Sequence, residues 1–507
     1  MNAKTYDVVV IGSGAGGGTV AEGLEPLARA GYRILVVEQG ARLRDEEFTG
    51  KESDMADALY EDGGGFLTAD GAMTLAFGRV WGGSTVVYTG TSLIAPKRVI
   101  EGWRVPGLTH ADVEQRSRRF MEENGVHLLE PDLLNDNNRL FVEGCAKAGY
   151  GAEQFPLNLR GCRGSSLCNL GCPNGAKQGT HRVQLPAALK DGVEAVTRAE
   201  ALRVEEGRVI LRVSAPAPGE KGAPSEWAPG DYAVSAKAIV AAGGSIGTTA
   251  LLLRSGLGPS LPRLGAGFTC HPAHILVAEH EHPITNDVGH PKSFYLDRAV
   301  EEGYVLETCM YFPFTTAKNL TGFGAPHATL MRAFPRLQMI LVLACDKAVP
   351  ENRISVDAGG KPVVHYTFTK NTVASLVSAT RAAARIFFAA GAVRVHAPSA
   401  DPPLLERHEA GAIDARVHER HFQTGRISVS AAHLMGGCGM GSSPGDSVTD
   451  SWGRVHGRPR LFVADSSLFP DSLEINPYLT VMALADRAAE RIREDAGALL
   501  GAPGGGP

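Results

Sequence analysis

The segment Asp7-Val8-Val9-Val10-Ile11-Gly12-Ser13-Gly14-Ala15-Gly16-Gly17 decides the fold of this chain. Its apolar half predicts a strand, and the glycines predict a tight turn that leads into a helix over residues 19–30. A second apolar run at residues 33–37 is followed at once by Glu38. Strand, glycine turn, helix, strand and acid in this order are typical of a dinucleotide-binding unit.

Each part of this unit has a physical task in nucleotide binding. Glycines let the backbone approach a pyrophosphate, whose negative charge then faces the positive end of the following helix. The acid at the end of the second strand can accept hydrogen bonds from an adenosine ribose. An ordinary glycine turn is the alternative, and the surrounding pattern makes it the weaker interpretation. The predicted contacts are Gly12, Ser13, Gly14, Gly17 and Glu38, and FAD and NAD both remain open.

Three later segments extend the nucleotide-binding prediction. Gly78-Arg79-Val80-Trp81-Gly82-Gly83-Ser84-Thr85 is a glycine-rich loop whose backbone N–H groups can lie against a flat cofactor, although it could also be a surface turn. Residues 238–244 read as a returning strand that ends in glycines. Residues 461–465 read as a third strand, with an acid at the end where open α/β sheets bind ligands. The predicted contacts here are Arg79, Trp81, Gly82, Gly83, Ser84, Ala242 and Asp465.

The C-terminal part of the chain contains a candidate catalytic pair. His433 stands in Ala431-Ala432-His433-Leu434-Met435-Gly436-Gly437-Cys438, and Asn476 stands in Glu474-Ile475-Asn476-Pro477-Tyr478-Leu479-Thr480. A histidine with its reference pKa of about 6.5 can accept a proton at near-neutral pH. The residues alone also allow a hydrogen-bonded core histidine at 433 and a turn residue before proline at 476.

The order of these segments resembles the glucose-methanol-choline (GMC) family of FAD-dependent alcohol oxidases and dehydrogenases. The resemblance covers nearly the whole chain and is weakest across residues 280–425. It implies an α/β fold, in which a Rossmann-like FAD-binding domain is interleaved with a substrate domain built on an antiparallel sheet. The implied ranges are 1–95, 186–279 and 426–500 for the FAD-binding domain, 96–185 and 280–425 for the substrate domain, and 501–507 for a flexible tail.

The resemblance also implies roles for single residues. His433 corresponds to the catalytic histidine of the family, and Asn476 to a partner that binds the hydroxyl group but does not titrate. Asp465, Pro477 and Thr480 are implied to surround the isoalloxazine ring and its ribityl chain. We expect noncovalent FAD, because the loop at residues 78–88 contains no histidine. Tyr88 departs from the family pattern, and we interpret His271-Pro272 as structural.

The segment at residues 161–180 carries three closely spaced cysteines. Cys162, Cys168 and Cys172, separated by glycines and followed by a proline, suit thiolates that converge on a 3Fe-4S cluster. The segment resembles that of iron–sulfur-containing sugar dehydrogenases of the family, and residues 171–180 also resemble its long-chain alcohol oxidases. The alternatives are buried thiols, a local disulfide, or a zinc site completed by His181.

Composition limits the class of partner and the location. The 50 Lys and Arg residues nearly balance the 55 Asp and Glu residues, and the net charge of -5 gives no basic surface for nucleic acid. Because the chain lacks a signal-peptide pattern and an apolar run of about 18 residues, we expect a cytoplasmic protein without a membrane segment. The expected partners are a small-molecule alcohol and an electron-acceptor protein or small subunit.

The expected reaction is the oxidation of an alcohol, either a sugar or a hydrophobic, lipid-like molecule, by hydride transfer to flavin N5 with His433 as general base. If the cluster is present, electrons leave through it, and the enzyme is a dehydrogenase. Without it, an alcohol oxidase that uses oxygen is the alternative. A lyase with a redox-silent FAD and a noncatalytic flavoprotein are two further alternatives.

Overall fold

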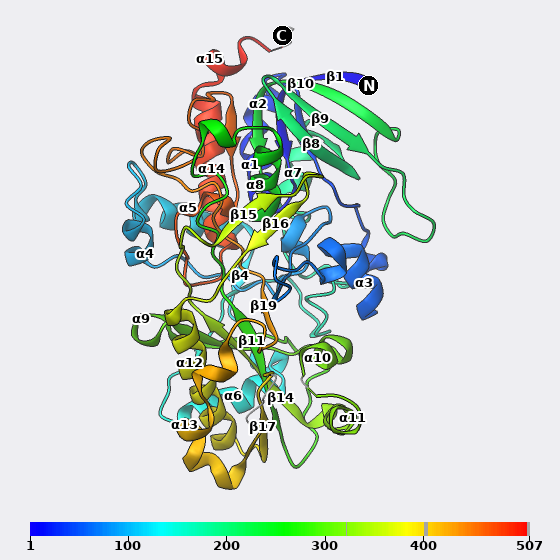
Figure 1. Ribbon diagram of the computed structural model, residues 1–507. Helices are drawn as coiled ribbons and strands as arrows, with labels where there is room; N and C mark the ends of the chain where they lie inside the picture. The colour runs from blue at the N-terminus through cyan, green and yellow to red at the C-terminus, as the bar shows by residue number, and fades with distance from the viewer. Residues whose placement is uncertain (321, 400–403, 504–507) are drawn as a thin grey trace.

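The structure is a computed structural model that describes residues 1–320, 322–399 and 404–503. Figure 1 shows an elongated molecule, with one sheet at the end that carries the N-terminus and a second sheet at the opposite end. Residues 504–507 of the predicted flexible tail lie outside the described residues. Among the residues described, no helix is long and apolar enough to cross a membrane.

The first sheet has the topology of a dinucleotide-binding domain. Its parallel strands follow the order β7-β2-β1-β10, with β20 on the other side of β10, and β9 and β8 extend it in antiparallel fashion. The bounds of these strands are β1 (Asn2–Ile11), β2 (Ile34–Val37), β7 (Glu194–Val196), β8 (Ala199–Glu205), β9 (Arg208–Val213), β10 (Gly230–Ala241) and β20 (Leu461–Val463).

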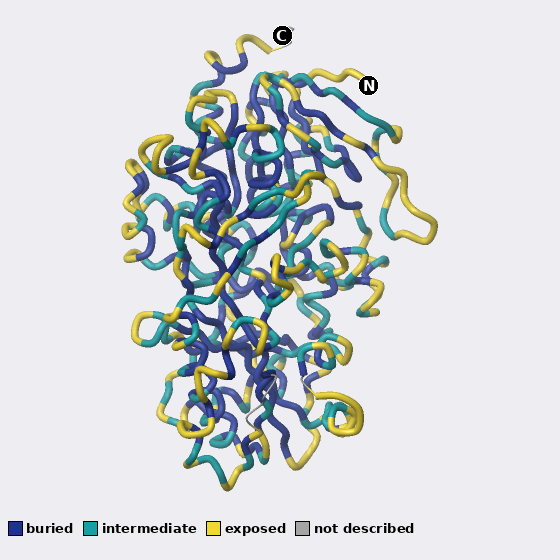
Figure 2. Tube along the Cα trace, in the orientation of Figure 1, coloured by how far each residue is buried: buried dark blue, intermediate teal, exposed yellow. Residues whose placement is uncertain are grey.

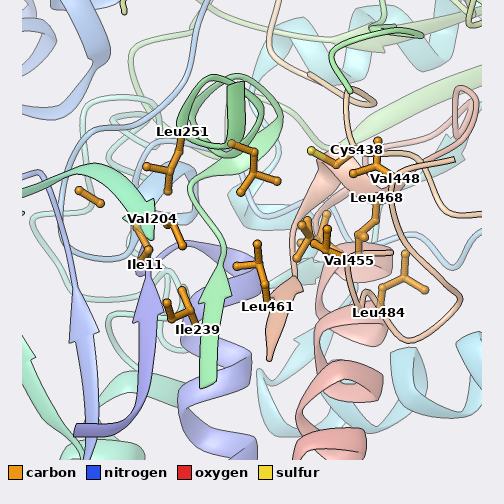
Figure 3. Packing of buried hydrophobic residues seen from close by; sticks show 14 of the residues in the cluster. Ile11, Val204, Ile239, Leu251, Cys438, Val448, Val455, Leu461, Leu468 and Leu484 are labelled. Carbon is orange, nitrogen blue, oxygen red and sulfur yellow. The ribbon is translucent and has the colours of Figure 1, made fainter. Parts of the chain in front are cut away.

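The apolar run of β1 is explained by cover on both faces of the sheet. Val8 and Val10 pack towards α1 (Ala15–Gly23), α7 (Gln184–Lys190) and α14 (Tyr478–Glu494). Val9 and Ile11 point to the other face, where α8 (Gly244–Arg254) and the segment before β20 cover them. Figure 3 shows this second cluster, in which side chains from segments far apart in the sequence meet. Parallel sheets need such cover, and their strands are therefore apolar throughout.

The helix predicted over residues 19–30 is interrupted. The structure has α1 up to Gly23 and a separate short helix, α2 (Glu25–Arg29). Pro26 stands in the first turn of α2, where its missing N–H group is tolerated but where it cannot continue the preceding helix. The prediction of a single helix was therefore wrong in this detail.

The second sheet is antiparallel except at one edge. Its main path is β18-β17-β11-β14-β13-β12-β5, and β19 joins β11 to β3. The bounds are β3 (Met73–Leu75), β5 (Glu153–Gln154), β11 (Ala273–Glu279), β12 (Phe294–Arg298), β13 (Tyr304–Thr308), β14 (Leu337–Ala344), β17 (Arg394–His396), β18 (Leu404–Glu406) and β19 (Val429–Ala431). Together the two sheets confirm the predicted fold class.

The two faces of the second sheet have different neighbours. On β14, Ile340 and Val342 pack in the cluster formed with α6 (Asp136–Lys147) and α12 (Lys370–Ala389). Leu341 and Leu343, which alternate with them, belong to a cluster on the opposite face. Leu341 and Leu343 on this second face line a cavity that also reaches the glycine turn after β1.

Three strands of the second sheet come from ranges predicted for the FAD-binding domain. They are β3, β11 and β19, and each has partners in the antiparallel sheet. β19 pairs with β11 through Ser430 and Ala273, and with β3 through Ala431 and Leu75. The chain therefore crosses repeatedly between the two sheets.

The remaining elements cover the sheets and connect them. Figure 2 shows that buried residues continue from one sheet into the other without an exposed layer between them. These elements are β4 (Val126–His127) with β6 (Leu157–Asn158), β15 (Arg353–Val356) with β16 (Pro362–His365), α3 (Glu52–Leu59), α4 (Lys97–Gly102), α5 (His110–Glu123), α9 (Ala299–Glu302), α10 (Pro313–Asn319), α11 (Ala325–Arg332), α13 (Ile413–Arg416) and α15 (Ala496–Leu500).

Candidate active site

A single cavity of about 620 Å³ joins the first sheet to the second. At one end it is lined by Glu38 and the glycine turn after β1. At the other end it is lined by His433, Asn476 and the inner face of β11 and β14. The predicted nucleotide-binding residues and the predicted catalytic pair therefore line the same cavity.

The glycine turn after β1 contains a glycine that is packed against the backbone and another that faces open space. Gly12 has a φ of +107°, and a Cβ there would lie 2.2 Å from the carbonyl oxygen of Ala242. Gly14, in contrast, faces open space, where an added Cβ would meet only the Cα of Gly83 at 3.8 Å. In the described chain, no side chain caps the first turn of α1. The N–H groups of this turn are available to an anion, as in other pyrophosphate sites.

Glu38 organises the nucleotide end of the cavity. Its buried carboxylate accepts hydrogen bonds from the backbone N–H of Ser13 at 3.1 Å and from that of Gly40 at 2.7 Å, and also from the Ser13 hydroxyl. Burial raises the pKa of Glu38, and these three hydrogen bonds oppose that effect. Because each carboxylate oxygen has a further lone pair, Glu38 can still accept a hydrogen bond from a ribose hydroxyl.

The glycine-rich loop is fastened to the turn after β1. The N–H of Gly82 donates to the Ser13 hydroxyl at 2.9 Å, and the Thr180 hydroxyl donates to the Ser13 carbonyl at 3.0 Å. A Cβ on Gly83 would lie 2.7 Å from the Cα of Gly14, so the two turns touch through glycines alone. These contacts fix the distance between the turn and the loop.

Asp465 connects β20 to the start of α8. Its buried carboxylate accepts hydrogen bonds from the N–H of Gly244 at 2.9 Å, from the N–H of Ser467 at 2.8 Å and from the Thr248 hydroxyl. Burial raises its pKa, and the same hydrogen bonds oppose the shift. Asp465 lines the cavity, and within the described residues its carboxylate mainly holds protein groups in place.

His433 is held between two side chains at the far end of the cavity. Its Nε2 lies 3.1 Å from Nδ2 of Asn476, and its Nδ1 lies 2.9 Å from Nδ1 of His271. Burial lowers the pKa of His433 well below 6.5, and His271 and Lys292 lower it further. The imidazole is therefore neutral at pH 7, and it can accept a proton.

A buried ion pair lies beside His433. Lys292 pairs with Glu307 of β13, and both side chains are buried. Lys292 lines the main cavity, while Glu307 shares a small adjoining recess with His433 and Asn476. Glu307 is opposite Leu341 in the sheet, so the pair stands at the border of an otherwise apolar surface. Burying two charges requires desolvation, which makes a purely stabilising role for the pair a weak explanation.

Most of the predicted site residues line the cavity. Those that do so are Gly12, Ser13, Gly14, Glu38, Arg79, Gly83, Ser84, Ala242, Asp465, Pro477, His433 and Asn476.

Four predicted contacts, among the described residues, lie outside the cavity wall. Gly17 packs under the turn, where a Cβ would lie 1.9 Å from the carbonyl oxygen of Gly12. Trp81 is buried in the core of the first domain, and Gly82 packs against His181. Thr480 is fully buried on α14. These residues support the walls of the cavity from behind.

Two models of the GMC oxidoreductase family match this chain. One matches residues 56–273 and the other matches residues 350–485, which together are more than half of the sequence. The chain belongs to the GMC oxidoreductase family. FAD binding is therefore expected for this GMC oxidoreductase.

Individual relatives agree with this assignment. An uncharacterized GMC-type oxidoreductase of Mycobacterium tuberculosis is 33% identical over 499 residues, which cover 96% of this chain and 75% of the relative. A long-chain-alcohol oxidase of Arabidopsis thaliana is 26% identical and covers 96% of this chain and 67% of its own length. The structure of pyridoxine 4-oxidase from Mesorbium loti is similar with a TM-score of 0.70 and 18% identity, and covers 96% of this chain and 99% of the other.

The arrangement fits FAD. The space in front of Gly14 and the uncapped start of α1 suit a pyrophosphate, and Glu38 lies beside them for the ribose. α14 begins at Tyr478 against the cavity, and in the described structure no side chain caps its first turn. The positive end of this helix favours negative charge on a reduced flavin ring.

The cysteine segment does not show the donor arrangement of a metal centre. Among the described residues, no group of three or more His, Cys, Asp or Glu side chains could hold a metal ion. Burial raises the pKa of Cys162, and it raises that of Cys168 to about 12, which favours the protonated thiols. The Lys177 ammonium group donates hydrogen bonds to the carbonyl groups of Val86, Tyr88 and Cys168. These bonds tie the cysteine segment to the glycine-rich loop.

The open space in front of Gly14 allows the position of the cofactor to be tested. We expect Gly14→Val to fold but to lose FAD, because an added Cβ at this position enters the space in front of the turn and meets only the Cα of Gly83, at 3.8 Å. The measurement is the flavin absorbance of the purified protein, together with its thermal unfolding midpoint. Gly151→Val is the matched control, since an added Cβ at Gly151 also meets open space but at an exposed position away from the cavity. Full FAD content in Gly14→Val would contradict the placement of the cofactor.

Proposed function

We propose that this GMC oxidoreductase oxidises the hydroxyl group of a hydrophobic alcohol to a carbonyl group, with His433 as the general base. The observation that carries the proposal is the position of the His433–Asn476 pair, joined at 3.1 Å, in the wall of the same cavity that Glu38 and the glycine turn line. A base and a hydrogen-bond donor on one side of a shared cavity are what the removal of an alcohol proton requires.

The two side chains divide the chemistry between them. His433 is kept neutral by burial, so its Nε2, which faces the Asn476 amide, can accept the hydroxyl proton of an alcohol that takes the place of that contact. Asn476 cannot titrate, and its amide group orients the alcohol oxygen by hydrogen bonding. FAD, when bound, supplies the acceptor for the hydride at its N5 atom. The chain itself therefore moves one proton and holds the alcohol carbon in place.

The inner face of the second sheet favours a hydrophobic substrate over a sugar. Ala273 and Ile275 of β11 are opposite Leu343 and Leu341 of β14, and all four line the cavity. Met310 continues this apolar surface. Such a surface gains free energy from burying methylene groups, at about 0.8 kcal/mol for each. The likeness to an Arabidopsis long-chain-alcohol oxidase supports the same substrate class.

Two routes for the electrons were open from the sequence. A 3Fe-4S cluster at Cys162, Cys168 and Cys172 would make the enzyme a dehydrogenase with a protein acceptor. Without a cluster, oxygen, a quinone or another acceptor must react at the flavin site itself. The thiols do not form a metal-binding group in the described chain, and this favours the second route. The choice between oxidase and dehydrogenase then depends on the acceptor.

The central test is flavin reduction in His433→Ala. We expect wild-type flavin to be reduced anaerobically by primary alcohols, with kcat/KM rising up to about fourfold for each added methylene. In His433→Ala, reduction should be at least ~100-fold slower while FAD content is unchanged, because the general base is lost. Stopped-flow absorbance of the flavin measures both effects.

His127→Ala removes an exposed histidine and should behave as wild type. Unchanged flavin reduction in His433→Ala would exclude the general-base role. Reduction by glucose but not by long-chain alcohols would replace the substrate class, and turnover without flavin bleaching would indicate a lyase.

The pH dependence of kcat/KM tests the environment of His433. The active form is the neutral imidazole, so activity falls as the pH drops through the pKa of His433, which lies well below 6.5. Removing the Lys292 ammonium raises this pKa, and we expect the acid limb in Lys292→Met to move to higher pH. In the double variant Lys292→Met/Glu307→Gln, the acid limb should also move to higher pH. This variant does not leave a buried carboxylate without its partner.

The control for this experiment is Lys147→Met, which removes an exposed lysine on α6. Its pH profile should coincide with that of wild type. An acid limb that stays in place in both Lys292 variants would show that the ammonium does not act on His433.

Iron analysis tests the route of the electrons. We expect the aerobically and the anaerobically purified protein to contain flavin but no stoichiometric iron, and to show no cluster signal in electron paramagnetic resonance. Replacing Cys162, Cys168 and Cys172 together by Ser should then leave anaerobic flavin reduction within a few-fold of wild type. If the wild-type protein contains about three iron atoms per chain and the triple variant loses them, the protein has a 3Fe-4S cluster and the dehydrogenase assignment is favoured.

A further inference from the structure

His271 links the catalytic histidine to a buried serine. Its Nδ1 lies 2.9 Å from Nδ1 of His433, and its Nε2 lies 3.1 Å from Oγ of Ser472. The two imidazole rings meet edge to face, with their centroids 5.0 Å apart and an angle of 89° between the planes. His271 and Ser472 are both buried. The contact is therefore a directed hydrogen bond and not a loose packing contact.

The proton positions on His433 and His271 can be assigned by starting from the Asn476 amide. Asn476 presents its amide nitrogen to Nε2 of His433, and an amide nitrogen only donates. Nε2 of His433 must therefore accept, which places the proton of the neutral ring on Nδ1. That Nδ1–H faces Nδ1 of His271, which must accept in turn. His271 then carries its proton on Nε2 and donates it to Oγ of Ser472.

The tautomer selected in this way is the one that a general base needs. If the His433 proton were on Nε2, the ring would present a donor to the alcohol and could not take its proton. His271 can accept only if it is neutral, and burial lowers its pKa to about 4. It is therefore neutral across the range in which an alcohol dehydrogenation would be measured.

We propose that His271 is a positioning residue for alcohol oxidation: it accepts a hydrogen bond from Nδ1–H of His433 and so keeps Nε2 as the proton-accepting nitrogen, which faces the Asn476 amide here and would face the alcohol O–H in the reaction. This inference rests on the proposed function of His433. In the proton-transfer step, the O–H bond of the alcohol breaks and an N–H bond forms at Nε2 of His433. His271 gains and loses no proton, and it remains the acceptor for the Nδ1–H of the imidazolium.

A neutral acceptor has a different effect from a carboxylate in the same place. A carboxylate beside Nδ1 would favour the imidazolium and raise the pKa of His433. The charged groups nearest the pair come from other elements: Lys292 lines the cavity, and Asp297, Glu307 and Glu474 line the adjoining recess. With His271 as its immediate partner, His433 is oriented without being made permanently positive.

The test compares two variants of almost the same shape. In His271→Asn, an amide oxygen near the position of Nδ1 can accept the proton of His433, whereas His271→Leu offers no acceptor. We expect anaerobic flavin reduction to slow ~10 to 100-fold in His271→Leu, the size found for partners that orient metal-bound imidazoles. His271→Asn should stay within a few-fold of wild type. FAD content should be unchanged in both.

A merely structural role for His271 would give a different pattern. It would slow both variants equally, and the thermal unfolding midpoints would follow the loss of activity. Equal flavin reduction rates in the Leu and Asn variants, or wild-type rates in both, would overturn the inference. If His271→Leu does not fold, Ser472→Ala provides a second test, because the His271 ring loses the acceptor of its Nε2–H and an intermediate loss of rate is expected.

His433→Ala separates this inference from the proposed function. If flavin reduction is normal in His433→Ala, the proposed function fails, and the inference fails with it. If His433→Ala is slow but His271→Leu is normal, only the inference fails. If both are slow and His271→Asn is active, both stand.

Discussion

The structure depends on a close approach of backbones that only glycine permits. A Cβ on Gly12 would lie 2.2 Å from the carbonyl oxygen of Ala242, and a Cβ on Gly16 would lie 1.7 Å from that of Ala464. Three segments that are far apart in the sequence thus meet without side chains between them. This contact sets the ends of β1, β10 and β20 at the same edge of the sheet. The cofactor turn and the carboxylate of Asp465 are positioned by the same contact.

The catalytic pair is brought to that edge by the strands that cross between the sheets. His433 follows β19, which pairs with β11 and β3, and Asn476 precedes α14, which packs on α1. The pair is therefore supported from both halves of the molecule, with one side chain held by each. A base that must stay within hydrogen-bonding distance of a substrate oxygen benefits from this double support, because a small displacement would break the reacting geometry.

Site residues could be predicted from the sequence wherever residues close together in the chain form a recognisable motif. The glycine turn with Glu38, and His433 with Asn476 through the family resemblance, are of this kind, and the structure places them around one cavity. The break of the first helix is also a local feature, caused by Pro26, but the prediction from the sequence missed it. His271 was interpreted as structural, since nothing in its neighbours shows that its ring meets His433 from a distance of 162 residues. The Lys292–Glu307 pair could not be predicted from the sequence for the same reason. Nor could the positions of Trp81 and Thr480 behind the cavity wall.

The pairing of β20 with β10 has a consequence for the newly made chain. The C-terminal half of β10 has an open edge on this side until Leu461 to Val463 have been synthesised, more than 200 residues after Ala241. An unpaired apolar edge is a site for wrong association, and pairing over such a separation is slow. Asp465 and Asn476 emerge only after this strand. During synthesis, the chain must therefore protect a nearly complete sheet for some time before its active site can be completed.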